Sequence, residues 1–206
     1  MRAIKLLLVV LFMAVSTQAA TIYVRVDGSN SICNGTVNAS AASTPNCAYA
    51  TPAQAISTAS CGDVIKFLAG DTWDGTITLP NKSCSVSTPI TITSTATLPS
   101  RRVTPADASL MPRFRTLGTD GHGAFTTATD AGWWVLDGLE ITDNAGMSTV
   151  NALVEFGEPV TGVHDVTLTR SWVHQKETGT NYERAALRAV RFEGVRLTLT
   201  RNYLDT

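Results

Sequence analysis

The chain has 206 residues, of which 44% are hydrophobic and 16% are charged, and its formal net charge at pH 7 is −1. This length is enough for one domain with a substantial core. The near-neutral charge and the lack of a basic stripe with interleaved aromatic residues argue against nucleic acid as a partner. Abundant Thr, Ser, Val and Gly favour extended sheet over a helical bundle.

The N-terminus has the pattern of a secretory signal peptide. Arg2 and Lys5 precede an unbroken apolar stretch over residues 6–15, and small residues then lead up to Ala19. This pattern predicts a signal peptide over residues 1–19 with cleavage after Ala19. An uncleaved anchor or a buried strand is the competing interpretation, but a bilayer span needs about 20 apolar residues. We therefore expect a secreted, periplasmic or cell-surface protein with no membrane insertion after cleavage.

The N-terminal part of the mature chain, residues 20–62, contains an extended segment over 22–26, a turn-rich loop and one helix. The loop and the region after it carry three glycosylation sequons, at Asn34, Asn38 and Asn81. The helix is predicted over "TPAQAISTAS", because Thr51 suits the N-cap, Pro52 the first helical position and Gln54 a capping box. We expect Gly62 to end it.

Four cysteines lie in the first half of the mature chain. An even number behind a signal peptide predicts two disulfides, for which three pairings are possible. The turn-rich loops between neighbouring cysteines favour Cys33–Cys47 and Cys61–Cys84. A zinc site is the alternative, but the sequence has no C-x-x-C pair and no histidine near the cysteines.

Residues 63–206 consist of short apolar segments separated by Gly, Asn, Asp and Pro, which predicts many short strands. The segment "DTWDG" is expected to be a turn, with its tryptophan packing against the core and its acids forming the turn. The expected strands are 64–68, 76–79, 89–93, 133–136, 153–156, 166–169, 189–192 and 197–200.

Three of these segments repeat. "VLDGLEIT" (135–142), "TLTRSWVH" (167–174) and "TLTRNYLD" (198–205) align at offsets of 32 and 31 residues. The alignment predicts two apolar columns, Leu136, Leu168, Leu199 and Ile141, Val173, Leu204, with a corner between them at Leu139, Ser171, Asn202.

At such a corner an Asn or Ser side chain can bond the neighbouring backbone and tolerate a left-handed conformation. Stacked strand–corner–strand units predict a solenoid of parallel strands, whereas an antiparallel sandwich with similar strands is the alternative. We expect segment 64–68 to be the first strand of the stack, with the helix covering its open end.

The opening "DGSN", "CNG", "YATPAQAI" and "CGDVIKFLAG", followed by "PITIT", "WWVLDGLEIT" and "VTLTRSWVH", resembles the pectin-lyase-like superfamily. The later segments are similar to those of secreted polysaccharide lyases of the alginate-lyase and chondroitinase-B type. The resemblance implies an all-β fold, namely a right-handed parallel β-helix with a short N-terminal capping α-helix. It also implies polysaccharide as a partner. No cofactor is evident in the sequence itself, and calcium is implied by the resemblance alone. We expect a monomer. We also expect an N-terminal fragment, because residues 63–206 stop in the middle of a repeat.

No catalytic motif of that superfamily can be matched residue by residue, so candidate site residues come from the repeat pattern. Elimination from a uronate needs a base and a cation that neutralises the carboxylate, whereas hydrolysis needs two facing carboxylates. Glu155 and Arg191 are predicted to point outward from neighbouring strands. Arg170 and Arg201 occupy the same repeat position and could grip an acidic sugar. His174 begins a polar loop and could supply a base.

Each candidate also has a plainer interpretation. Glu155 and Arg191 can form an ordinary surface ion pair, Arg170 and Arg201 can be solvated corner residues, and His174 can belong to an ordinary loop. The sequence leaves open whether the protein is catalytic. A lyase of acidic polysaccharide, a non-catalytic carbohydrate-binding or adhesive protein and a structural cell-surface protein all fit, and a lyase fits better than a glycoside hydrolase.

Overall fold

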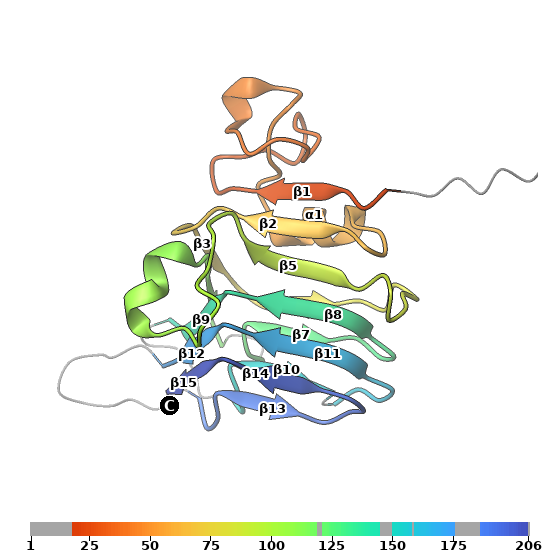
Figure 1. The fold of residues 1–206 in the computed structure, drawn as a ribbon, viewed down its shortest axis with the longest axis vertical. Coiled ribbons are helices and arrows are strands. Elements are labelled where there is room, and N and C mark those ends of the chain that lie inside the picture. The colour runs from red at the N-terminus through yellow and green to blue at the C-terminus, as the bar shows by residue number, and fades with distance from the viewer. Residues whose placement is uncertain (1–17, 119–120, 145–149, 158, 176–185, 206) are drawn as a thin grey trace, which may run out of the picture.

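The computed structural model describes residues 18–118, 121–144, 150–157, 159–175 and 186–205. These residues form a mostly β structure with three parallel sheets and few helices (Figure 1). The all-β class expected from composition is confirmed.

Each sheet contains strands that are far apart in the sequence. The six-stranded sheet has the order β1 (Thr21–Val24), β2 (Val64–Phe67), β5 (Ile90–Ser94), β8 (Gly132–Asp137), β11 (His164–Thr169), β14 (Thr198–Thr200). The five-stranded sheet has the order β15 (Tyr203–Asp205), β12 (Trp172–His174), β9 (Glu140–Asp143), β6 (Arg113–Thr116), β3 (Thr72–Asp74). The four-stranded sheet has the order β13 (Val190–Phe192), β10 (Val154–Phe156), β7 (Phe125–Thr127), β4 (Ile77–Leu79). From β2 onward the chain enters these three sheets in turn and then begins again.

The helix α1 (Pro52–Thr58) forms where the sequence predicts it, while two short 3₁₀ helices, η1 (Ala41–Ser43) and η2 (Pro105–Leu110), lie in connections. The Thr51 side chain accepts a hydrogen bond from the backbone N–H of Gln54, as a capping residue does. The helix ends at Thr58, so the expected end at Gly62 is wrong. Gly62 instead has a φ of +92° in the turn that leads into β2.

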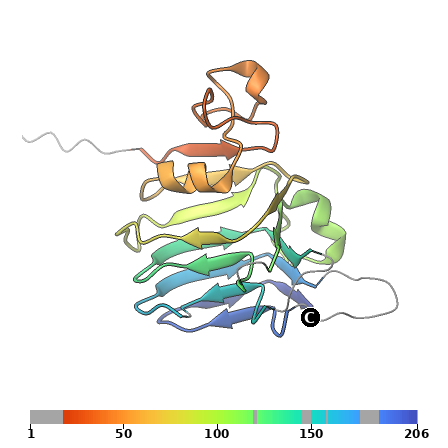
Figure 2. The same ribbon diagram turned by 180° about the vertical axis from the view of Figure 1, so that it is seen from behind.

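The expectation that segment 64–68 begins the stack is also wrong. Strand β1 pairs in parallel with β2, from Thr21 opposite Val64 to Val24 opposite Phe67. The helix α1 contacts β1 and β4, and it lies against the first strands at the end where the chain enters (Figure 2). The N-terminal strand is therefore part of the six-stranded sheet.

Two disulfides fix this N-terminal region. The structure contains Cys33–Cys47 and Cys61–Cys84, the two pairs that the sequence favours. The first closes the loop after β1, and the second joins the turn before β2 to the loop after β4.

The two predicted apolar columns are confirmed. Strand pairing places Leu168 between Leu136 and Leu199, and Val173 between Ile141 and Leu204. Leu136 and Leu168 are fully buried, whereas Leu199 and Leu204 in the last described strands are 43% and 47% exposed. A side chain in this interior is thus fully buried when its strand has a neighbouring strand on each side in the sheet.

The five-stranded sheet adds an aromatic column to the same interior. Trp73 lies opposite Phe114 in the strand register, and their rings stack with centroids 5.6 Å apart. Phe67 meets both rings edge-on, an arrangement that aromatic pairs prefer. Trp73 packs as expected, but it lies in strand β3, so "DTWDG" is not a simple turn.

The corner between the six-stranded and five-stranded sheets is held by short polar side chains. Asn202 accepts a hydrogen bond from the N–H of Ser171 (2.8 Å), and its amide donates to Leu168 O (2.8 Å). The hydroxyl of Ser171 in turn accepts from the N–H of Leu139 (3.2 Å). These bonds confirm the expected corner. The left-handed residues, however, are Arg170 and Arg201, each directly before the short side chain.

Replacing Leu168 by Asp tests the column. A buried carboxylate without a partner destabilises by several kcal/mol, a large share of a typical stability of about 5–15 kcal/mol. We expect Leu168→Asp to give no cooperative unfolding transition by circular dichroism. Thr167→Asp, on the outward side of the same strand, is the control and should unfold cooperatively. A cooperative, native-like Leu168→Asp protein would contradict the column.

Candidate functional site

The outward side of the five-stranded sheet concentrates charged and aromatic side chains. Successive side chains of a strand point to opposite faces of the sheet. In each strand of this sheet the central side chain therefore points into the interior, and the side chains on either side of it point outward. Strand register places the outward residues in two columns. These are Thr72, Arg113, Glu140, Trp172, Tyr203 and Asp74, Arg115, Thr142, His174, Asp205.

Glu140 lies at the centre of these columns, and its side chain is only 3% exposed. Its Oε1 lies 2.8 Å from Arg113 Nε and 3.1 Å from His174 Nε2. Burial raises the pKa of the Glu140 carboxyl, but the contacts with His174 and Arg113 outweigh burial, so this pKa lies below its usual value. Glu140 is therefore a carboxylate that holds two basic side chains, rather than a proton donor.

His174 is not placed as a general base. Its Nε2 faces Glu140 and its Nδ1 lies 2.9 Å from Gln175 O, so both ring nitrogens face acceptors. Both nitrogens are thus engaged by protein atoms rather than turned towards the solvent. The ring also stacks on Trp172, with centroids 3.6 Å apart. The structure gives His174 a positioning role, and its predicted neighbours 176–177 lie outside the described residues.

Three buried atoms at this site lack a hydrogen-bond partner among the described residues: Glu140 Oε2, Trp172 Nε1 and Arg113 Nε. Arg113 Nε contacts Glu140 Oε1 as an ion pair, whereas Glu140 Oε2 and Trp172 Nε1 belong to residues that lie directly opposite each other in the strand register. Buried polar atoms are normally satisfied, so these two are available to a water molecule or a ligand hydroxyl.

Glu155 and Arg191 lie opposite each other in the register, as the sequence predicts. Among the described residues, however, Arg191 pairs with Glu193 at 2.6 Å, and a Glu155 oxygen lies 3.2 Å from His122 Nδ1. Glu155 is also buried, with 3% exposure, because the connection that carries His122 lies over it. The expectation of an exposed Glu155 that holds Arg191 is therefore wrong.

The Glu155–His122 contact forms an arrangement that the sequence reasoning missed. The buried carboxylate also accepts from the N–H of Ala152 (3.3 Å), which fixes its position. It faces one nitrogen of an imidazole whose side chain is 43% exposed. A buried carboxylate that orients an accessible histidine is typical of general-base sites.

Arg170 and Arg201 occupy equivalent left-handed corners, with φ values of 45° and 57°. They lie on neighbouring strand ends, because Thr169 pairs with Thr200. Arg170 is bonded to Asp137 through Nε (2.7 Å) and Nη2, which raises the pKa of its guanidinium. Arg170 is thus already paired with a carboxylate, and joint binding of an acidic sugar by the two arginines stays a prediction.

Arg201 instead lies beside a second arginine from a distant segment. The connection that contains η2 packs its apolar residues against Trp172 and Tyr203. In the same connection the N–H of Val103 donates to Arg201 O (3.3 Å), and the guanidinium of Arg102 lies 5.5 Å from the centre of the Tyr203 ring. In the described part of the chain, neither Arg102 nor Arg201 forms an ion pair. We call Arg102, Arg201 and Tyr203 the arginine corner.

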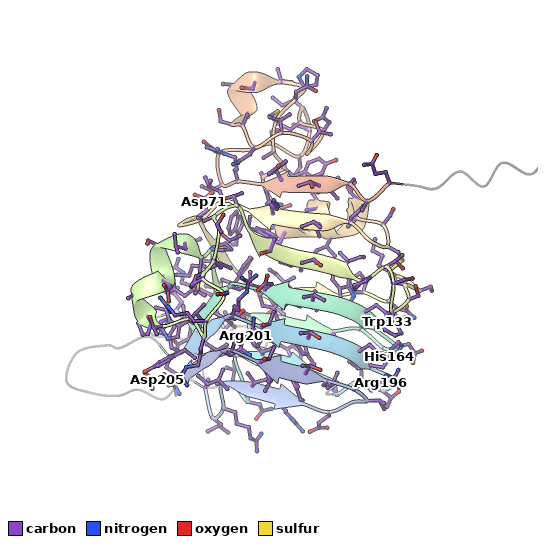
Figure 3. All side chains as sticks on the ribbon, viewed as in Figure 1. Asp71, Trp133, His164, Arg196, Arg201 and Asp205 are labelled. Carbon is purple, nitrogen blue, oxygen red and sulfur yellow. A yellow bond between two sulfur atoms is a disulfide. The ribbon has the colours of Figure 1, made fainter. Side chains whose placement is uncertain are left out.

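Arg201 and Asp205 lie on the same side of the molecule, at the opposite ends of the strands from Trp133, His164 and Arg196 (Figure 3). At that far edge Trp133, Asp165 and Arg196 share a left-handed conformation, and Asp165 binds Arg196. Because Asp165 neutralises Arg196, the arginine corner has the more accessible positive charge.

The described residues contain no cluster of three or more His, Cys, Asp or Glu side chains that could hold a metal ion. Calcium therefore rests on the resemblance alone.

No family model and no curated protein sequence matches this chain. A rhamnogalacturonan lyase has a similar structure, with a TM-score of 0.50 and 17% identity over 76% of this chain and 36% of that one. An alginate lyase from Paenibacillus sp. str. FPU-7 aligns with a TM-score of 0.37 and 16% identity, over 70% of this chain and 53% of that one. The chain thus spans about a third of the first protein and about half of the second. At this identity the first likeness concerns the fold.

Glu140→Gln tests the central carboxylate. The change leaves Arg113 and His174 without a buried counter-charge, and we expect a loss of about 1–3 kcal/mol at pH 7, since Arg113 is partly solvated. The folded-state pKa of Glu140 is lowered, so its contribution is present above the ordinary glutamate pKa and disappears as the pH falls below about 4. Urea unfolding should therefore show a difference between the two proteins that shrinks on acidification.

Glu193→Gln is the matched control, because Glu193 is exposed and pairs with Arg191 at the surface. A surface pair contributes about 0–1 kcal/mol. Equal losses for the two variants, or a difference that is independent of pH, would contradict the role given to Glu140.

Proposed function

We propose that the fold is a right-handed parallel β-helix of the pectin-lyase-like type. The repeated passage of the chain through three parallel sheets supports this proposal, as does the structural likeness to a rhamnogalacturonan lyase. In this proposal residues 1–19 are a signal peptide, residues 20–62 form the N-terminal strand, disulfide loop and capping helix, and residues 63–206 form the rungs.

The same proposal makes the protein an exported one. Two disulfides are compatible with an oxidising compartment. None of the helices in the described part of the chain has the length and apolar character needed to cross a membrane.

The proposed function is binding of an acidic polysaccharide at the arginine corner. One observation carries it: the segment with Arg102 is bonded to the backbone of Arg201 through Val103, and neither arginine has a carboxylate partner among the described residues. Guanidinium groups bind carboxylates through paired, charge-assisted hydrogen bonds.

A lyase reaction is the second candidate function, and the His122–Glu155 pair favours it. Elimination from a uronate needs a base for the sugar proton and a cation for the carboxylate. His122 follows β6 and Arg201 precedes β15, so the pair and the arginine corner are separated along the strands, by about 10–13 Å, and across the sheet, where β15 lies three strands from β6. A glycan lying across the sheet would meet the base at one end and the arginines at the other.

Arg201→Ala and Arg102→Ala test the binding function. Each removes a charge-assisted contact, so we expect the affinity for oligouronates to fall by about 1.5–3 kcal/mol, or roughly tenfold or more. Isothermal titration against a panel of acidic and neutral oligosaccharides measures this change. The effect should weaken as the salt concentration rises, because exposed charges are screened.

Arg196→Ala is the control, since Arg196 is more than half exposed but lies at the opposite edge and pairs with Asp165. Its affinity should equal that of the unaltered protein. If no acidic glycan in the panel binds, the carbohydrate function fails and a structural role replaces it. If glycans bind and no unsaturated sugar is released by a protein carrying both His122 and Glu155, the protein is a binding module.

A further inference from the structure

Asp63 is a buried carboxylate that has no cationic partner among the described residues. It is 7% exposed and lies directly before β2. Its Oδ2 accepts a hydrogen bond from the N–H of Ser60 (2.8 Å). Buried carboxylates are normally paired with a positive charge, so the position of Asp63 calls for a cation.

The other oxygen of Asp63 faces the start of the folded chain. The backbone nitrogen of Ala20 lies 2.7 Å from Asp63 Oδ1. Ala20 is held there from its other side, because the N–H of Val64 donates to Ala20 O (2.9 Å) as β1 begins to pair with β2.

The carboxylate itself is also fixed. The N–H of Asp63 donates to Ser60 O (3.1 Å), and the N–H of Thr91 donates to Asp63 O (3.0 Å). The preceding Gly62 takes a left-handed conformation, and the Cys61–Cys84 disulfide anchors the turn. The position of Asp63 therefore does not depend on Ala20.

Ala20 is the first residue after the cleavage point that the signal pattern predicts. We propose that hydrolysis of the Ala19–Ala20 peptide bond is a processing step that creates an ammonium group for the Asp63 carboxylate. Water, used by a signal peptidase, gives its oxygen to the carbonyl carbon of Ala19 and breaks the bond to Ala20 nitrogen. The products are a carboxylate on Ala19 and an amine on Ala20, which takes up the proton that the new acid releases.

Cleavage thus replaces a neutral donor by a charged one, so the contact with the Asp63 carboxylate becomes an ion pair without moving either atom. Residues 18–21 are exposed, so water can reach the added protons of the ammonium while one of them stays on Asp63. The ammonium adds to this hydrogen bond the Coulomb attraction between two opposite charges. Processing therefore stabilises the contact between the start of β1 and the turn before β2. The stability of the first strand becomes linked to removal of the signal peptide.

The pH dependence has a definite sign. An ammonium paired with a carboxylate has a raised pKa, compared with an ordinary value of about 7.7–8.0. The extra stability is therefore complete below that ordinary value and is lost as the pH rises through the raised value. No such change occurs when Ala20 carries an amide nitrogen.

The test compares the exported protein that begins at Ala20 with the same protein carrying a Gly-Ser extension before Ala20. N-terminal sequencing of the exported protein should begin at Ala20. At pH 6 the unfolding constant of the processed form should be about tenfold lower, which corresponds to a rise in the thermal midpoint of roughly 3–6 °C. The difference should disappear above about pH 10, and Asp63→Asn should abolish it.

A form acetylated on the Ala20 amine is the matched control, because it lacks only the charge. It should unfold like the extended form. If Asp63→Asn does not fold, the Ala20 amine can be titrated in the unaltered protein through its reactivity towards an acylating reagent. A titration midpoint above the ordinary value for an α-amino group would show that the ammonium is paired with Asp63.

Equal midpoints for the processed, extended and acetylated forms would overturn the proposal. So would an exported protein that begins at another residue, although export itself would then stand. A protein that stays in the cell with its leader attached would count against export as well. None of these outcomes depends on glycan binding.

Discussion

Hydrogen bonding between parallel strands in a fixed register determines where the side chains of this protein lie. Each strand is only three to six residues long, and it pairs with strands from the preceding and following passages of the chain. The register places like residues above one another, so that one inward column carries isoleucine and leucine, and another carries tryptophan, phenylalanine and isoleucine. The same register builds the outward columns that carry the charged groups. Interior packing and the surface site therefore have a common origin.

The corners between sheets are where this regularity is strained. Arg170, Arg201, Trp133, Asp165 and Arg196 all have positive φ values, which are uncommon for residues with a side chain. Neighbouring bonds stabilise these conformations, as where Asn202 satisfies the backbone on both sides of its corner. Arginines at these positions are carried away from the sheet, which makes the corners the natural place for charged contacts.

The sequence predicted most of the fold because the fold is repetitive. The Leu168 and Val173 columns follow from the alignment of three short segments. Thr51 and Pro52 predict where the helix begins. The strands around Trp73, Phe114 and Phe125 were missed because each has a single large apolar residue with polar neighbours. Such a pattern resembles a turn until a neighbouring strand is known.

The candidate site was harder to predict, because its members come from separate passages of the chain. Arg201 was found from its repeat position, but its neighbour Arg102 lies in a connection without repeats. His122 sits in a glycine-rich turn, where only the buried Glu155 reveals a chemical use. Glu140 was hidden because a residue on the outward side of a strand is expected to be solvated, and here three neighbours cover it.

The spacing of 31–32 residues between the equivalent strands β8, β11 and β14 bears on how such a chain can change length during evolution. Loss or gain of one residue inside a strand reverses the side chains that follow it in that strand, but the next corner restores the pattern. A gene rearrangement that duplicates or removes one whole unit of three strands leaves each column continuous. Long connections such as the one containing η2 lie outside the columns, so they are free to diverge. Selection can therefore alter the binding surface and the number of units separately, while the packing rule stays the same.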